Sequence, residues 1–106
     1  MVITTTESLP GRRITAVMGV AVGSTVRTKN IGKDIGAGFK SLVGGELKSY
    51  SAMLVEARSE ALSRMEAQAT ELGADAVVNL RFMTSAVASG ASEILAYATA
   101  VTTEPV

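Results

Sequence analysis

The sequence predicts one α+β domain in which two pairs of extended segments flank a short helix and a long one, in the order ββααββ. Apolar residues recur at helical spacing across residues 48–73, and β-branched or alternating segments stand on both sides of that stretch. The length of 106 residues suits a single domain. Because aromatic residues make up only 4% of the chain, we expect a core of aliphatic side chains, alanine and methionine.

The first two strands are predicted over residues 1–6 and 13–28. Residues 1–6 are rich in β-branched side chains, and Pro10 and Gly11 then favour a turn. In the second segment one parity is apolar: Ile14, Ala16, Met18, Val20 and Val22. The interior Gly19 and Gly23 indicate bulges or close backbone approach.

A short helix is predicted over residues 30–45. Its apolar residues follow spacings of four, four and three: Ile31, Ile35, Phe39 and Leu42. Each interior glycine costs such a helix about 1 kcal/mol relative to alanine, so the segment must dock on another element. No phosphate-loop motif is present, although the lysines of this segment leave a weak anion site at a helix start open.

The long helix, residues 48–73, has the strongest pattern in the chain. Its apolar stripe comprises Tyr50, Met53, Leu54, Ala57, Ala61, Leu62, Met65, Ala69 and Leu72. Gly73 stands where a helix-terminating glycine is expected, and Glu60 with Arg64 forms a favourable pair on the outer side. At about 35 Å the helix is as long as a 100-residue domain is wide, so we expect it to reach the edge of its subunit.

The last two strands are predicted over residues 76–83 and 94–103. Val78, Leu80 and Phe82 define one face of the first, and the small-residue tract 85–92 is expected to turn the chain. Both faces of the final strand are apolar or small, which is typical of a strand covered on both sides. In so small a chain, another subunit is one source of the second cover.

Charge and composition exclude several classes of function. Ten basic and ten acidic residues give a net charge of zero, so neither nucleic acid nor an anionic membrane is an expected partner. The basic residues concentrate before residue 49 and the acidic ones after it, which indicates either two solvated faces or complementary subunit contacts. The absence of cysteine and of a membrane-spanning segment favours a soluble, cytoplasmic protein.

Neither catalysis nor a soft-metal site has support in the residue types present. The chain has no histidine base and no cysteine nucleophile, so we expect no enzyme and no cofactor. Heavy metals prefer thiolate and imidazole ligands, and the methionines fall on apolar positions where core packing is the better explanation. A ring of carboxylates around a symmetry axis remains open as a site for a harder cation.

Arg58 is the most informative candidate binding residue, because a helical wheel places it within the apolar stripe beside Leu54 and Leu62. A charge there needs a partner, and the candidates are Glu46, Asp75 and Glu93. Either Arg58 forms a structural ion pair, or it binds an anion in a cleft between subunits. The weak candidate ligand-binding residues are therefore Arg58, Glu46 and Asp75.

Several separated blocks resemble the YbjQ-like family of bacterial and archaeal proteins, which carries the description "putative heavy-metal-binding". They are Gly44-Gly45-Glu46, Ala57-Arg58 with Ala61, the run Gly-Ala-Asp-Ala-Val-Val at residues 73–78, and the ending from Glu93 through Val101. The resemblance implies a two-layer subunit of antiparallel strands on a helix, similar to the dodecin subunit. It also implies cyclic homo-oligomers, typically pentamers, and no established activity. Ala98 stands where the family pattern has glycine.

Overall fold

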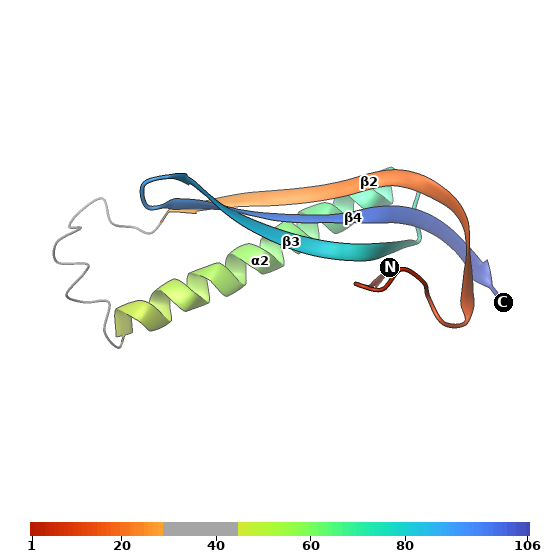
Figure 1. Cartoon of the computed structure of the whole chain (residues 1–106), viewed down its shortest axis with the longest axis horizontal. Helices are drawn as coiled ribbons and strands as arrows, with labels where there is room; N and C mark the ends of the chain where they lie inside the picture. The colour runs from red at the N-terminus through yellow and green to blue at the C-terminus, as the bar shows by residue number, and fades with distance from the viewer. Residues whose placement is uncertain (29–44) are drawn as a thin grey trace.

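The computed structural model describes residues 1–28 and 45–106, except for the side chains of residues 45–49. In chain order the elements are β1 (Val2–Ile3), β2 (Arg12–Thr28), α2 (Gly45–Glu71), β3 (Ala76–Ala88) and β4 (Ala91–Pro105). The strands form one sheet in the order β1-β3-β4-β2, and α2 lies across one face of it (Figure 1). The predicted α+β class with four strands and one long helix is confirmed, whereas the predicted short helix lies outside the described residues.

The sheet is not wholly antiparallel, which corrects one part of the expected fold. The pairs β2–β4 and β3–β4 are antiparallel, but β1 runs parallel to β3, with Val2 opposite Ala76 and Ile3 opposite Val77. A parallel pair needs a long connection, and the whole of β2 and α2 separates these two strands along the chain. The final strand, β4, is central in the sheet, between β3 and β2.

The end of α2 follows the expected glycine signal. Gly73 has a φ of 85°, and its N–H donates to the carbonyl of Thr70 at 3.0 Å. The N–H of Ala74 donates to the carbonyl of Ala69 at 3.1 Å, which completes a Schellman motif. The helix therefore ends as predicted, and the following residues enter β3 directly.

The hairpin between β3 and β4 differs from the sequence prediction. The tract 85–92 was expected to turn the chain, but β3 continues to Ala88 and β4 begins at Ala91. Only Ser89 and Gly90 form the turn, with Gly90 at a φ of 75°. Alanine and serine give little strand signal on their own, so the extension depends on pairing with β4.

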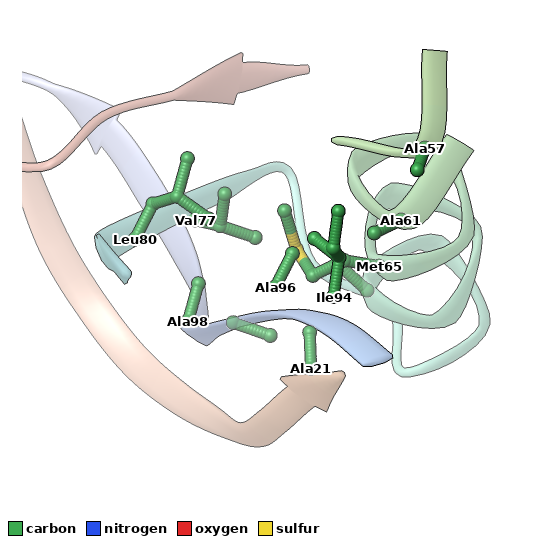
Figure 2. Packing of buried hydrophobic residues seen from close by; sticks show 11 residues of the cluster. Ala21, Ala57, Ala61, Met65, Val77, Leu80, Ile94, Ala96 and Ala98 are labelled. Carbon is green, nitrogen blue, oxygen red and sulfur yellow. The ribbon is translucent and has the colours of Figure 1, made fainter. Parts of the chain in front are cut away.

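The main core lies between α2 and the sheet and is built mostly from alanine (Figure 2). Its fully covered residues include Ala21, Ala57, Ala61, Met65, Ala69, Val77, Ile94, Ala96, Ala98 and Ala100. Small side chains bring the layers close together, and the limit is reached at Gly23. A Cβ there would lie 2.2 Å from the carbonyl oxygen of Ala61 and 2.3 Å from the nitrogen of Met65. The expected close approach at Gly23 is confirmed.

The opposite face of the sheet has a much smaller core. Leu9, in the connection between β1 and β2, packs with Ala76, Val78 and Val101 at the end of the sheet near both chain termini. No described element covers the rest of that face (Figure 1).

The single chain is elongated. Its Cα radius of gyration is 17.5 Å and its principal extents are 57 × 22 × 16 Å. A compact domain of this length has a radius of gyration of about 13 Å. The long dimension follows from β2 and β4, which are 17 and 15 residues long and pair over nearly their full length.

Candidate functional site

The candidate site is the face of the sheet opposite α2, and alternation along β2 shows how it forms. Ala21 and Thr25 point toward the helix and are buried. The valines of the opposite parity point the other way: Val20 is 64% exposed, Val22 40% and Val26 54%. Three valines of one strand therefore face outward with no cover from the described chain.

The same face continues across β4 and β3. Tyr97 lies between Val22 and Arg81 in the strand register, and Leu95 lies between Ser24 and Met83. Met83 is 52% exposed, whereas Leu95 and Tyr97 are half-buried. We refer to Val20, Val22, Val26, Met83, Leu95 and Tyr97 as the open sheet face. These apolar residues span three strands and share the face with Ser24, Arg81 and Glu93. An exposed apolar patch of this kind marks an interaction site.

β3 is also exposed on the face of the sheet that α2 covers elsewhere. Phe82 lies opposite Ala96, which faces α2, yet Phe82 is 43% exposed. The helix packs chiefly on β2 and β4 and hardly touches β3. The outer half of β3 therefore lacks cover on both faces within the described chain.

Polar contacts at the β2 edge join that strand to α2. Arg27 donates to Oε2 of Glu60 at 2.6 Å, and Glu60 also pairs with Arg64 one helical turn later. Arg64 donates to the carbonyl of Ser24 at 2.6 Å. The hydrogen bond from Arg27 is the main reason that the pKa of Glu60 lies below its ordinary value. Partial burial opposes this shift, and the two guanidinium charges reinforce it. The predicted Glu60–Arg64 pair is confirmed.

Arg58 is more exposed than its place on the helical wheel predicted. Its side chain is exposed, and within the described residues it makes no ion pair or hydrogen bond. The buried line of the helix instead follows Ala57, Ala61 and Met65. Those small side chains allow the close approach to Gly23, so they define the inner face, and Arg58 falls outside it. Arg58 lies one turn from the half-buried Leu54 and Leu62, as the wheel placed it, but it is not buried with them.

The other two candidate residues are not close to Arg58 in one chain. Asp75 follows the end of α2, and the helix from residue 58 to that end is about 20 Å long. Its carboxylate accepts from the hydroxyl of Thr103 at 3.0 Å and from the Thr103 N–H at 3.2 Å. Glu46 belongs to the first turn of α2, and its side chain lies outside the described residues. Asp75 therefore has a structural role at the edge of β4, and one chain does not assemble the three residues into a site.

Two features of this region carried no recognised signal in the sequence. Gln68 accepts a hydrogen bond from the N–H of Val22 through its side-chain oxygen. Asn79 has a φ of 57° at the irregularity in β3 between Val78 and Arg81. Asparagine tolerates this conformation better than most residues, which is the one local hint at that position. The partner of Gln68 is 46 residues away, so no local pattern indicates it.

No metal centre is found within the described residues, since no three carboxylates there gather into a cluster that could hold an ion. Cysteine and histidine are absent from the whole chain. A search of the described helix likewise finds no stretch long and apolar enough to cross a membrane.

Comparison with known proteins places the chain in a family. The family model described as "Putative heavy-metal-binding" matches residues 1–104. A UPF0145 protein of Methanoculleus marisnigri is 58% identical over 105 residues, which cover 99% of this chain and 98% of that protein. A UPF0145 protein of Thermotoga maritima is 53% identical over 106 residues, the full length of both.

A solved structure supports the fold. The crystal structure of a protein of unknown function from the DUF74 family of Pediococcus pentosaceus matches with a TM-score of 0.66. It covers 98% of each chain at 18% identity, so the likeness concerns the fold alone. Together with the family model and the close relatives, the expected family is confirmed: the chain belongs to the YbjQ (UPF0145) family, which bears the description "Putative heavy-metal-binding".

Proposed function

We propose that this protein is the subunit of a ring-forming homo-oligomer that acts as a structural or binding module and not as an enzyme. The observation that carries the proposal is the open sheet face on an elongated subunit. Removing apolar surface from water contributes about 25 cal/mol per Å². Covering exposed residues such as Val20, Val26 and Met83 would therefore stabilise an oligomer. The family resemblance adds the expectation of a pentamer.

The outer side of α2 carries small side chains, and this is compatible with a second copy of the chain as the partner that covers the open sheet face. Ala52, Ser59, Ser63 and Ala67 are exposed there, so another sheet can approach the helix closely. A contact between a sheet face and a different surface of the next copy is head-to-tail, and such contacts close into rings when the rotation permits.

Native mass spectrometry and sedimentation velocity test the proposal. We expect a discrete oligomer, and Val22→Lys is expected to shift it toward smaller species because a charge would be buried in the contact. Ser8→Lys adds the same charge at an exposed turn and serves as the control. A wild-type protein that sediments as a stable monomer at micromolar concentration would contradict the proposal.

A second candidate function is metal or small-ligand binding at subunit interfaces, and the family description favours it. Because Arg58, Glu46 and Asp75 are apart in one chain, such a site would combine residues of adjacent copies. Metal analysis of untagged protein tests this candidate, with Asp75→Asn and Glu46→Gln as the informative variants. A retained cation lost in either variant supports it, whereas metal-free wild-type protein after equilibrium dialysis against divalent cations excludes it.

A further inference from the structure

The outer edge of β2 is a potential surface for strand addition. β2 is the last strand of the sheet, and no other strand of the described chain pairs with its outer side. Such an edge presents unpaired N–H and C=O groups that bind the edge strand of another chain unless they are blocked. The segment from residue 19 to residue 26 has no charged residue and contains four valine or threonine side chains, which favours pairing.

Two side chains of α2 occupy this edge. The N–H of Val22 points away from β4, because it donates to Oε1 of Gln68 at 2.5 Å. Alternate residues of a strand direct their backbone groups to the same side, so those of Ser24 point outward as well. The carbonyl of Ser24 accepts from Arg64 at 2.6 Å. A strand adding to β2 would have to bind these same two groups.

The arrangement that holds these side chains is built into the helix contact. Arg64 and Gln68 are one turn apart on α2 and therefore lie on the same side of it. Gly23, between the two covered positions, lets the backbone of α2 approach β2 directly. Glu60 pairs with Arg64 from the preceding turn and with Arg27 from β2. The helix side chains are thus held beside the strand by several independent contacts.

We propose that Arg64 and Gln68 block strand addition to β2 by a second copy of this chain, so that self-association uses the other surfaces of the subunit. A second copy is the relevant partner because Val20, Val22 and Val26 of the same strand belong to the open sheet face. Assembly through that face raises the local concentration of neighbouring β2 edges. The identity of the partner thus rests on the proposed function, whereas the blocking contact rests on the hydrogen bonds.

The test compares Arg64→Ala/Gln68→Ala with wild type by hydrogen exchange and sedimentation velocity. We expect exchange at the Val22 amide to speed up by about tenfold or more once its acceptor is removed. We also expect species larger than the wild-type oligomer, with thioflavin T fluorescence if pairing continues without limit. Gln68→Ala alone is the second variant if the double variant fails to fold, because the exposed side chain of Gln68 takes no part in the core.

Two matched variants control the experiment. Gln68→Glu retains an oxygen acceptor and is expected to preserve slow exchange at Val22 and the wild-type size. Glu71→Ala removes an exposed side chain from the end of the same helix and is expected to leave both readouts unchanged.

The outcomes separate this proposal from the proposed function. Unchanged exchange at Val22 in the double variant overturns the proposal, and so does faster exchange with an unchanged size distribution. If wild type is a monomer, the ring proposal fails. In that case, association of the double variant supports the blocking role, and a monomeric double variant contradicts it.

Discussion

β2 and β3 flank the same central strand, yet they have opposite surroundings. β2 contacts the backbone of α2 at Gly23, and helix side chains bind its outer edge at Val22 and Ser24. On its outer side β3 is bonded to β1 and to residues 4–6 as far as Arg81, and beyond that point no described strand pairs with it. Phe82 and Met83, which follow, are both about half exposed. One helix covers two strands of a four-stranded sheet, and the outer half of the third long strand has no cover within the described chain.

The largest effect is expected from Gly23→Val, which disrupts the contact between β2 and α2. Even a Cβ would lie 2.2 Å from the Ala61 oxygen, so α2 must move away from β2. We expect a loss of about 4 kcal/mol in the free energy of unfolding, measured by urea denaturation. Ser24→Ala, at the neighbouring half-buried position, is the control and is expected to change the free energy of unfolding by less than about 1 kcal/mol. A Gly23→Val protein of wild-type stability would show that the two backbones are not in contact.

Truncation of one methionine in the covered region and one in the exposed region compares the two regions directly. Met65 is fully covered, and Met65→Ala is expected to cost about 3 kcal/mol through the cavity it leaves. Met83 is 52% exposed, and Met83→Ala is expected to cost less than about 1 kcal/mol in a dissociated chain. Urea denaturation over a range of protein concentrations measures both. If the cost of Met83→Ala rises with protein concentration, a partner covers β3.

Gly73→Ala tests the turn that joins α2 to β3. The φ of 85° strains any residue with a Cβ, so we expect a loss of about 1 kcal/mol in the free energy of unfolding. Gly73→Asn is the control, because asparagine tolerates this conformation and is expected to lose less. Equal losses in both variants, measured by thermal unfolding, would contradict backbone strain as the cause.

The smallest effect is expected from the ion pairs at the β2 edge. Because the pKa of Glu60 is lower in the folded chain than its ordinary value of 4.5, the folded state gains stability above that pH. This stability is lost as the pH falls through the folded-state pKa, where Glu60 becomes protonated. Glu60→Gln is expected to reduce the dependence of unfolding on pH in this acidic range, whereas Glu56→Gln retains it. Identical pH profiles for wild type and Glu60→Gln would contradict the prediction.

Sequence patterns predicted the helix and strands better than they predicted which elements and side chains contact one another. The spacing of Ala57, Ala61, Met65 and Ala69 identified the inner face of α2, and these four are its buried residues from residue 50 onward, where side chains are described. The same wheel included Arg58, because it weighted the large Leu54 and Leu62 at the margin of the stripe. In the structure the small side chains allow the closest contact, and Arg58 is exposed.

The candidate binding residues were predicted least well, for a physical reason. A charged residue on a helix indicates a need for a partner but not where that partner lies. Asp75 binds Thr103, which is 28 residues away, and Glu60 binds Arg27, which is 33 residues away. Such pairs depend on strand register, which no local pattern in this chain specifies.

The sequence by itself determined the α+β class, the inner face of the long helix, its end at Gly73, and the small side chains of the core. These features follow from periodicity and backbone preference, which act over a few residues. Only tertiary contacts make β1 run parallel to β3, extend the β3–β4 hairpin to Ser89 and Gly90, and place α2 over β2 and β4, so that the outer half of β3 stays uncovered within the described chain. Those features depend on contacts between distant segments, and the approach of Gly23 to Ala61 and Met65 is the contact that sets the position of the helix.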